Sequence, residues 1–497
     1  MITLGLDIGS SSIKAALVDS ETGNTIAHAT VPDTELLISS PRFGYAEQDP
    51  DVWWECVVEA IHLLRGKAQG ALHSLGAIGI SYQMHGLVLI GREGKPLLPS
   101  IIWCDSRATE IGREAFDALG HQWCLDHLLN SPGNFTASKL RWVLQHRPAE
   151  GSMATKFLLP GDYIAYRLTG EATSSIPGLS EGMFWDFVSA SPSETLLHHY
   201  GIRPDLLPRL VPTFGDQGHI TKEAASLLGI PKGIPVSYRA GDQPNNAFSL
   251  NVLEPGEVAA TAGTSGVVYA IGDGLRSDPR SRVNAFAHVN YRVDHPRIGI
   301  LLCVNGTGIA NTWIRRMTGN TSVPYKALDG LAAQSPVGSK GVMAFPFGNG
   351  AERLFGDKLL GATFSGIDFT RHETPDLLRA VQEGIAFALH RGLQIMPSLG
   401  ITPKVIRAGL ANMFLSPIFC DTLATVTGTP LELYNTDGAG GAARGAAVGA
   451  GAYASPAEAF RGLQVQRTVE PSRASAPYYE AVERWSKVLD QILSGVK

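Results

Sequence analysis

The sequence predicts an α/β protein of two large domains. Its 497 residues exceed the size of about 250–300 residues at which a single hydrophobic core stops growing. Short apolar runs typical of buried strands alternate with helical stripes. A pattern of strand, small-residue turn and strand occurs at Gly9 and again at Gly263, about half the chain apart, as expected of a duplicated domain. We place the domain boundary near residues 250–256, which gives domains 1–250 and 251–497.

The first hairpin has its strands at residues 2–8 and 13–18, joined by a turn of Gly9, Ser10, Ser11 and Ser12. Small residues let backbone N–H groups approach a phosphate closely. Asp7 stands at the end of the first strand, where a carboxylate can help to hold Mg²⁺ together with water and phosphate oxygens. Taken alone, the segment fits an ordinary hairpin with a surface aspartate equally well.

The second hairpin joins strands at residues 257–262 and 267–271 through the turn 263–266. Two such turns from two domains can enclose a nucleotide, so the pair favours phosphate binding. The sequence has no G-x-x-x-x-G-K-[ST] motif, which argues against a P-loop fold. Just before this hairpin, Asp242 lies in a polar turn and could accept a hydroxyl proton during phosphoryl transfer. Its alternative role is to bind local backbone groups.

Helices and buried strands fill the rest of the pattern. Asp49-Pro50 begins a helix that reaches Leu64, and an apolar stripe recurs along it. The expected buried strands are residues 77–81, 100–103 and 404–408, and the other expected helices are residues 374–396 and 416–427. The Gly/Ala-rich residues 438–452 indicate a helix in tight contact with its neighbour rather than a linker.

Polar side chains follow two of these strands. Loops at the carboxyl ends of strands bind ligands in open α/β sheets. Gln83, His85, Asp105 and Arg107 offer donors and acceptors for a polyhydroxylated sugar, and Trp103 can cover an apolar sugar face. Packing in the core is the alternative for the histidine and the tryptophan. Metal binding by His85 is not favoured, because no second ligand stands at metal spacing.

The composition is that of a globular protein, with 44% hydrophobic and 18% charged residues. A net charge of −5 provides no general field for nucleic acid or an anionic membrane. The five cysteines are scattered, so we expect reduced thiols rather than disulfides or zinc. No signal peptide or membrane span is evident. We therefore expect a cytoplasmic protein that binds neither nucleic acid nor membrane. A homodimer is one compatible assembly.

These motifs resemble, in order and spacing, those of the FGGY carbohydrate kinases, over nearly the whole chain. The matching elements are Asp7-Ile-Gly-Ser-Ser11, Gln83-Met-His-Gly86, Trp103 with Asp105 and Arg107, Phe135–Trp142, Gly241-Asp242 and Ala262-Gly-Thr-Ser-Gly266. Within the family they are most similar to the xylulokinase group. The resemblance implies two actin-like (ribonuclease H-like) domains with a nucleotide and sugar cleft between them. It also implies ATP, Mg²⁺ and phosphorylation of D-xylulose to D-xylulose 5-phosphate.

Roles carried over by position divide the residues between the two domains. The resemblance makes Asp242 the catalytic base and Asp7 the residue at the metal. Sugar contacts are then expected from Gln83, Met84, His85, Trp103, Asp105 and Asp242. Nucleotide contacts are expected from Ser10, Ser11, Ser12, Gly263, Thr264, Ser265, Gly409, Leu410, Ala411 and Asn412.

Three segments depart from the xylulokinase pattern. Cys104 replaces the common asparagine, and Ala408–Met413 replaces a Gly-Gly-Gly-Ala-x-Ser loop in the adenosine region. Residues 348–353 keep Glu352 and Arg353 but differ around them. The chain is therefore interpreted as a divergent branch, with its nucleotide base preference open. The alternatives are an FGGY kinase for another ketose, a polyol or a sugar acid, and a non-enzymatic actin-like nucleotide switch.

Overall fold

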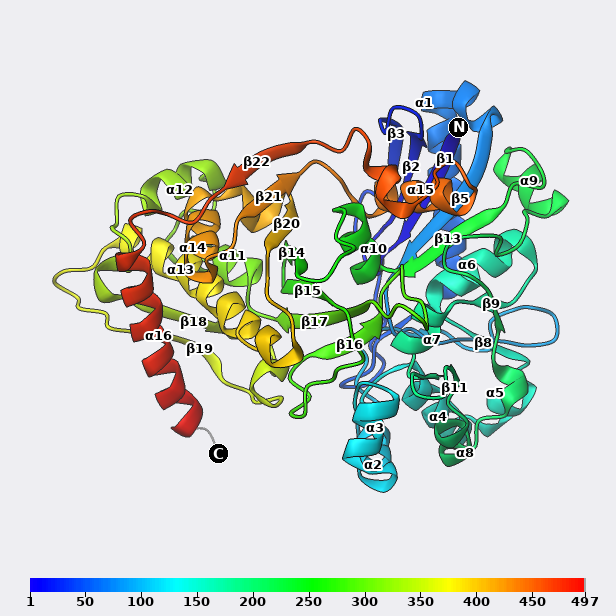
Figure 1. The fold of residues 1–497 in the computed structure, drawn as a ribbon, viewed down its shortest axis with the longest axis horizontal. Coiled ribbons are helices and arrows are strands. Elements are labelled where there is room, and N and C mark those ends of the chain that lie inside the picture. The colour runs from blue at the N-terminus through cyan, green and yellow to red at the C-terminus, as the bar shows by residue number, and fades with distance from the viewer. Residues whose placement is uncertain (496–497) are drawn as a thin grey trace.

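The computed structural model describes residues 1–495 and contains two large sheets, one from each half of the chain (Figure 1). The first sheet has the order β13-β5-β1-β2-β3. Its strands are β1 (Ile2–Ile8), β2 (Ile13–Asp19), β3 (Thr25–Val31), β5 (Leu75–Tyr82) and β13 (Val236–Gly241). β1, β5 and β13 are parallel, whereas β2 and β3 complete an antiparallel meander. The first predicted hairpin is thereby confirmed.

The second sheet has the order β16-β17-β15-β14-β20-β21-β22. Its strands are β14 (Glu257–Ala262), β15 (Gly266–Gly272), β16 (Asn284–Ala287), β17 (Ile298–Val304), β20 (Val405–Gly409), β21 (Leu431–Tyr434) and β22 (Val465–Val469). β14 and β15 form the second predicted hairpin, and β14, β20 and β21 are parallel. Both sheets thus repeat a hairpin followed by parallel strands, as the duplicated pattern predicts.

Helices cover the two faces of the first sheet. Asp49 caps α1 (Pro50–His73), which packs on the face of Leu4, Leu6 and Ile8 through residues such as Trp53. Side chains alternate along a strand, so Gly5 faces the other way. A Cβ atom on Gly5 would lie 1.8 Å from the carbonyl oxygen of Ala439, within α15 (Gly438–Gly449). The absence of a side chain there lets the helix backbone touch the sheet.

The predicted tight contact of residues 438–452 is therefore confirmed, but its partner is unexpected. α15 comes from the second half of the chain and packs on the first sheet, where Gly79 also approaches Ala442. All strands of the first sheet precede residue 250, and all strands of the second sheet follow it. The α15 helix crosses this division, because it follows residue 250 in the sequence but packs on the first sheet. Figure 1 shows α15 beside β1 and β5, far from α16 (Ala476–Gly495).

In the second half, the expected helices and strand are found with small shifts. α13 (Thr374–Leu393) ends slightly before the predicted Met396, and α14 (Pro417–Thr427) is capped by Ser416. β20 replaces the expected strand 404–408 with a one-residue shift. The remaining helices are α2 (Thr109–Leu119), α3 (His121–His127), α4 (Thr136–His146), α5 (Pro148–Met153), α6 (Pro160–Thr169), α7 (Ile176–Glu181), α8 (Glu194–Tyr200), α9 (Lys222–Leu228), α10 (Asp242–Ser249), α11 (Gly308–Met317) and α12 (Tyr325–Ala332).

One predicted strand is wrong. Residues 100–103 contribute only the two-residue β7 (Ser100–Ile101), which pairs with β4 (Glu47–Gln48) outside both large sheets. An apolar run signals burial but does not determine sheet membership. The other short strands are β6 (Val88–Ile90), β8 (Lys156–Leu158), β9 (Thr173–Ser174), β10 (Trp185–Asp186), β11 (Ser191–Pro192), β12 (Arg209–Leu210), β18 (Met343–Phe347) and β19 (Gly361–Ser365).

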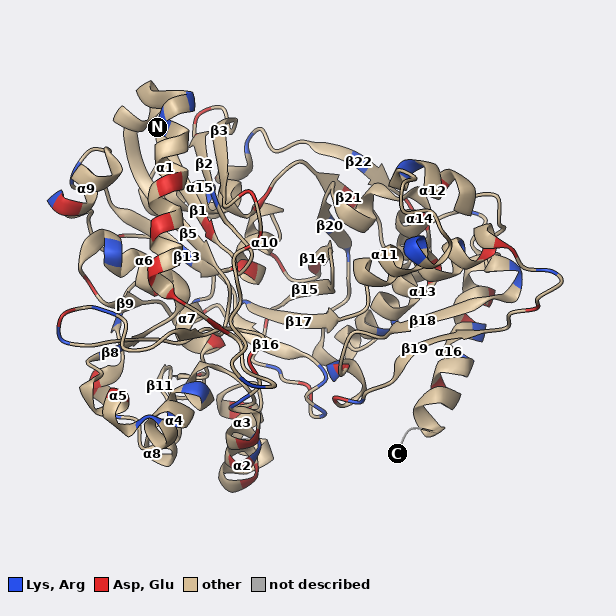
Figure 2. Ribbon diagram, turned by 180° about the vertical axis from the view of Figure 1, so that it is seen from behind, with Lys and Arg blue, Asp and Glu red and all other residues tan. Residues whose placement is uncertain are grey.

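Charged residues are dispersed over both halves of the molecule (Figure 2). The five cysteines are unpaired. Among residues 1–495, no helix combines the length and apolarity that crossing a membrane would require.

Candidate active site

The parallel strands of the first sheet bring three predicted segments to one edge. β1, β5 and β13 end at Ile8, Tyr82 and Gly241, and are followed by the serine turn, the Gln83–Gly86 loop and Asp242. Because the carboxyl ends of parallel strands meet at one edge of a sheet, these segments lie together. Along the sequence, about 70 residues separate the first segment from the second, and more than 150 residues separate the second from Asp242.

Asp7 lies beside the first residue of α15. A Cβ atom on Gly438 would be 2.6 Å from Asp7 Oδ2, so glycine leaves the room that the carboxylate occupies. Burial raises the pKa of Asp7, while the positive charge of Lys14 opposes that rise. The Asp7 carboxylate therefore lies in a crowded position beside Gly438, where its oxygens are candidate metal ligands.

Asp242 begins α10 directly after β13. Burial, followed by the negative charge of Asp7, raises its pKa to about 7, against an opposing hydrogen bond from the Gln243 backbone. A carboxylate with a pKa near neutrality can accept a hydroxyl proton and still be largely ionised slightly above pH 7. Its environment is suited to general-base chemistry.

His85 is held in one orientation. Its backbone has a φ of 61°, a left-handed conformation uncommon outside glycine. Its Nδ1 is 3.0 Å from the carbonyl oxygen of Glu181. Burial, and then the charge of Lys139, lowers its pKa to about 3, so the ring is neutral. A neutral ring that donates from Nδ1 leaves Nε2 as an acceptor for a ligand hydroxyl.

Glu181 is a member of this group that the sequence reasoning missed. Its carboxylate oxygens are buried without a hydrogen-bond partner. Oε2 lies 3.7 Å from His85 Nδ1 and would lie 3.1 Å from a Cβ on Gly241, where Met84 also packs. Burial raises the pKa of Glu181 well above its usual value, and the charge of Asp242 adds to that rise. The only signal in the sequence was that Glu181 is the one acid in the largely apolar stretch 176–185.

Lys139 was also missed as an individual residue, although it belongs to the motif Phe135–Trp142. It is fully buried. Its Nζ donates to the carbonyl oxygens of His85 at 2.8 Å and Ile102 at 2.9 Å. Burial lowers its pKa to about 7, opposed by the negative charge of Asp105. One ammonium group therefore ties the loop 83–86 to the loop 102–107.

Trp103 and Gln83 reach toward the serine turn. Trp103 is 52% exposed, and its Nε1 donates to Ser10 Oγ at 3.3 Å. Gln83 donates from Nε2 to Gln48 Oε1 at 3.3 Å, whereas its own Oε1 is buried without a partner. Gln48 in turn donates to the Ser10 carbonyl at 2.7 Å. The proposed sugar and phosphate segments are thus physically connected.

Asp105 does not have the free carboxylate expected of a sugar contact. It is fully buried, and its oxygens accept from the Ala46 N–H at 2.6 Å and from Arg107 at 2.6–3.0 Å. Arg107 also pairs with Glu47 and lies over the Tyr45 ring. This carboxylate and guanidinium hold the loop together, so the structure favours a role for Asp105 in shaping the loop, and its direct contact with sugar stays a prediction.

The nucleotide residues predicted from the second half also gather at a strand edge. Gly263 accepts a hydrogen bond from the Gly308 N–H at 2.8 Å, and Thr264 accepts from the Ile309 N–H at 3.2 Å. Asn412 Nδ2 would be 3.7 Å from a Cβ on Gly263. The turn containing Ser265 and the loop Gly409–Asn412 are therefore neighbours, with Leu410, Ala411 and Asn412 exposed.

Glu352, which the sequence shares with the xylulokinase pattern, binds the segment next to the Gly263 turn. It is fully buried, and its carboxylate accepts from the Asn305 N–H at 3.1 Å, three residues before Gly308. Burial raises its pKa to about 7. The adjacent Arg353 donates to Asn284. These two residues brace the segment on which the Gly263 turn rests.

The two edges converge through α15. The chain leaves β21 at Tyr434 and enters α15 at Gly438, next to Asp7, so these ends are at most about 14 Å apart. Asn245, on α10, donates to the Gly438 carbonyl at 2.9 Å. The first-domain carboxylates and the second-domain loops therefore border a common region.

The donor set at this region fits Mg²⁺. Among the residues described, no three or more His, Cys, Asp or Glu side chains form a metal-binding group. Mg²⁺ does not need one, because it prefers one or two carboxylates completed by water and phosphate oxygens. Asp7, crowded against Gly438 and electrostatically coupled to Asp242, is such a carboxylate.

Comparisons with known proteins match both halves. The N-terminal domain of the FGGY family of carbohydrate kinases matches residues 2–249, and its C-terminal domain matches residues 258–454. The xylulose kinase of Escherichia coli (strain K12) is 29% identical, with 99% of each chain covered. The crystal structure of xylulose kinase from Rhodospirillum rubrum is similar at a TM-score of 0.89 and 27% identity, with 99% of each chain covered. A gluconate kinase structure from Lactobacillus acidophilus shares the fold at a TM-score of 0.89 and 22% identity, covering 100% of this chain and 99% of the other.

Proposed function

Because the chain belongs to the FGGY family of carbohydrate kinases and has the actin-like, two-domain α/β fold of such kinases, we propose that it phosphorylates D-xylulose with ATP. The product is D-xylulose 5-phosphate. The observation that carries the assignment is the meeting of Asp242, whose pKa is raised to about 7, with the Met84–His85 loop at one strand edge. The similarity to xylulose kinases supports the choice of sugar.

In the proposed reaction, the terminal hydroxyl oxygen of the sugar attacks the γ-phosphorus of ATP. The bond from that phosphorus to the β–γ bridging oxygen breaks, ADP leaves, and the hydroxyl proton passes to the Asp242 carboxylate. Positioning and electrostatics provide most of the rate acceleration in such transfers. Mg²⁺ bound with ATP supplies neutralisation of phosphate charge, and Asp7 is the residue proposed to hold it.

The sugar side of the site is proposed to recognise hydroxyl groups. His85 offers Nε2 as an acceptor, and Gln83 offers an Oε1 that has no protein partner. Trp103 is exposed enough to cover an apolar sugar face. Each buried polar group that a wrong sugar leaves unpaired costs about 1–3 kcal/mol. Discrimination among polyols should therefore be large.

The nucleotide side is proposed to use the small-residue turns. Ser10–Ser12 and Gly263–Ser265 would meet the phosphates through backbone N–H groups. The exposed loop Gly409–Asn412 would meet the adenosine. The proposed location of the protein is the cytoplasm, where ATP is available.

A sugar acid is the rival substrate that the site itself addresses. Binding a carboxylate favours an unpaired cation near the sugar. Arg107 is paired with Asp105 and Glu47, and Lys139 is buried against two carbonyl oxygens. Both cations therefore already have partners within the protein, which favours a neutral sugar such as a ketose.

The test is ADP release by the purified chain with ATP and Mg²⁺, without sugar and with D-xylulose, D-ribulose, glycerol or gluconate. We expect turnover to depend on sugar and kcat/KM to be highest for D-xylulose. Turnover without sugar would support a nucleotide switch instead. A ranking led by glycerol, ribulose or gluconate would overturn the xylulose assignment and leave the kinase standing.

A His85→Ala variant sharpens this test. It should lower kcat/KM and also narrow the gap between D-xylulose and D-ribulose, because it removes a proposed hydroxyl partner. His28 is exposed on β3 and is not among the residues proposed to bind sugar or nucleotide, so His28→Ala is the matched control and should leave both quantities unchanged. If His85→Ala lowers only thermal stability and keeps the ranking, His85 does not select the sugar.

A further inference from the structure

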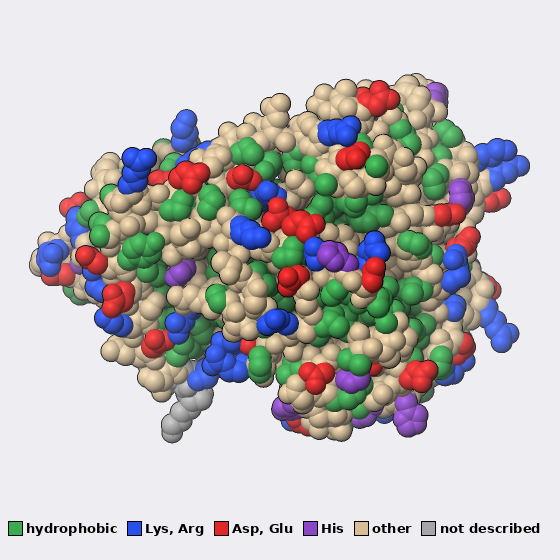
Figure 3. Space-filling view, in the orientation of Figure 1, with side chains coloured by type: hydrophobic (Ala, Val, Ile, Leu, Met, Phe, Trp, Pro, Cys, Tyr) green, Lys and Arg blue, Asp and Glu red, His purple; other side chains and the backbone are tan. Residues whose placement is uncertain are grey.

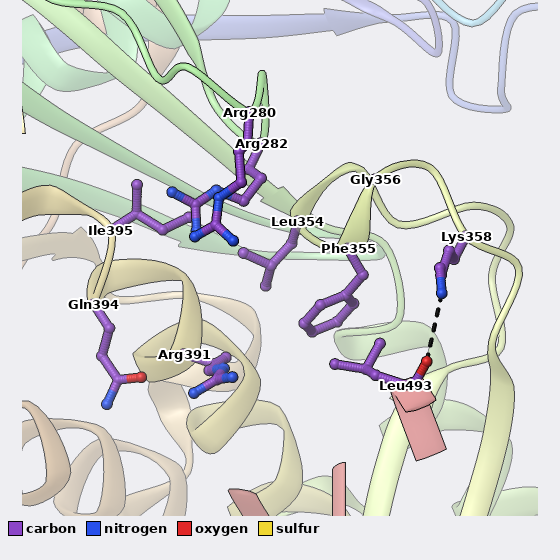
Figure 4. Close-up of a pocket in the computed structure, with 10 residues that line it drawn as sticks. All are labelled: Arg280, Arg282, Leu354, Phe355, Gly356, Lys358, Arg391, Gln394, Ile395 and Leu493. Atoms are coloured by element: carbon purple, nitrogen blue, oxygen red, sulfur yellow. Dashed lines mark hydrogen bonds between the residues drawn. The ribbon is translucent and has the colours of Figure 1, made fainter. Parts of the chain in front are cut away.

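A cavity of about 530 Å³ lies in the second half of the molecule, apart from the candidate active site. Its lining comes from four segments: the loop before β16, the segment after β18, the end of α13 and the end of α16 (Figure 4). None of the residues predicted to bind sugar or nucleotide lines it. Cavities of about 300–1,000 Å³ are typical of small-molecule sites.

Four cationic side chains surround this cavity, which we call the basic cavity: Arg280, Arg282, Lys358 and Arg391. Figure 4 shows the two arginines of the β15–β16 loop on one side of the cavity, and Arg391 with Gln394 on another. Lys and Arg side chains also gather on the surface near the end of α16 in the space-filling view (Figure 3). Such convergence in a concave site focuses a positive potential.

Three of these cations have partners within the protein, among them Lys358, which donates to the carbonyl oxygen of Leu493 at 3.4 Å (Figure 4). Arg282 pairs with Asp278 at 2.8 Å, and Arg391 pairs with Asp490 at 2.8 Å. Arg280 lies in the same loop as Arg282 and is exposed, and no carboxylate among residues 1–495 pairs with it. The basic cavity therefore carries an excess of positive charge. An arginine fork matches phosphate oxygens through two parallel hydrogen bonds.

Apart from Gln394 and Gly356, the rest of the lining is apolar. Leu354 and Ile395 are buried core residues whose surfaces border the cavity, and Phe355 and Leu493 complete this side. Inorganic phosphate would fill only the cationic part of a space this large. An organic group attached to the phosphate would cover the apolar part and gain from its burial.

We propose that the basic cavity binds a small organic phosphate, with its phosphate group on Arg280 and its organic part against Leu354 and Phe355. The site is separate from the phosphoryl-transfer site. The proposal does not depend on which sugar the enzyme phosphorylates.

The first test measures binding to the full-length chain by titration calorimetry. The probes are D-ribose 5-phosphate, D-ribose and inorganic phosphate, used at low ionic strength because phosphate contacts weaken with salt. We expect D-ribose 5-phosphate to bind most tightly and D-ribose not to bind. Equal affinity for inorganic phosphate would overturn the assignment of an organic ligand. Absence of binding up to millimolar concentrations would overturn the site.

A variant then locates the binding. Arg280→Gln should weaken D-ribose 5-phosphate by about 10- to 100-fold, the effect of losing a charge-assisted hydrogen-bond pair. Arg280→Lys should recover part of the loss. Arg473→Gln is the control, because Arg473 is exposed and lies outside the cavity. Both glutamine variants should keep wild-type sugar kinase turnover. If Arg280→Gln binds the probe as wild type does, the phosphate is held elsewhere and the proposal fails.

Discussion

Replacement of Asp242 by asparagine tests the proposed base while keeping the shape of the side chain. Asparagine cannot take the hydroxyl proton, so turnover should fall by about 10²–10⁴-fold, the usual contribution of a positioned general base. That loss corresponds to about 3–5 kcal/mol of transition-state free energy. ATP binding should persist, since Asp242 is not among the residues proposed to hold the nucleotide.

The raised pKa of Asp242 gives the same experiment a pH dependence. With a pKa of about 7, about one tenth of the carboxyl is ionised at pH 6 and about nine tenths at pH 8. Wild-type kcat/KM should therefore rise by about tenfold over this range. The residual activity of Asp242→Asn should lack this rise, because its side chain does not titrate.

The raised pKa of Asp242 also predicts that the stability of the fold falls with rising pH, whereas kcat/KM rises. Since its folded-state pKa lies above the ordinary 3.8, the folded chain binds this proton more tightly than the unfolded chain does. Ionisation of Asp242 therefore lowers the stability of the fold as pH rises from about 4 to about 7. Asp242→Asn should melt above wild type at pH 8, and this difference should shrink at pH 4–5.

Coupled ADP-release assays from pH 5.5 to 8.5 and thermal unfolding measure these quantities. Asp33→Asn is the control, because Asp33 is exposed. Turnover of Asp242→Asn within threefold of wild type, together with a flat wild-type profile, would refute the role of Asp242 as the base. A lower melting temperature at pH 8 would refute the explanation of its pKa.

Four further substitutions probe other parts of the structure. Gly5→Ala places a methyl group 1.8 Å from the Ala439 carbonyl oxygen, so it should lower the free energy of unfolding, measured by urea denaturation, by about 1–3 kcal/mol. Gly66→Ala is the control on open helix surface and should raise the free energy of unfolding by about 0.5–1 kcal/mol. Lys139→Met leaves two loop carbonyls without their donor, so the sugar KM should rise at least tenfold while nucleotide affinity measured by titration stays unchanged; equal losses for both ligands would indicate a general folding defect. Asp7→Asn should raise the Mg²⁺ concentration needed for half-maximal turnover, and an unchanged Mg²⁺ curve would make Asp7 structural.

Local chemistry made much of the fold predictable. The two hairpins carry their turn residues in sequence, and α1 and α14 carry their capping residues, Asp49 and Ser416. Glycine and alanine at 438–452 indicated close packing. The identity of the surface beneath was not predictable, because the sheet that α15 covers is formed more than 190 residues earlier.

The site was harder to predict where a residue acts through its surroundings. Asp105 and Glu181 are both acids near the sugar loops, yet one is saturated by Arg107 and the other is buried without a partner. Residue type cannot separate these cases, because the difference lies in which neighbours the fold supplies. Lys139 likewise acts through backbone carbonyls, which every residue has.

The position of α15 also bears on how the protein is made. The first sheet is complete in sequence at Gly241, but the helix that covers Gly5 and Gly79 ends at Gly449. At about 5–20 residues per second, a ribosome needs about 10–40 s to cover that distance. During this interval the nascent sheet lacks one layer. A fragment ending near residue 250 should therefore bind chaperones or aggregate, and adding the 438–449 segment should help it to fold.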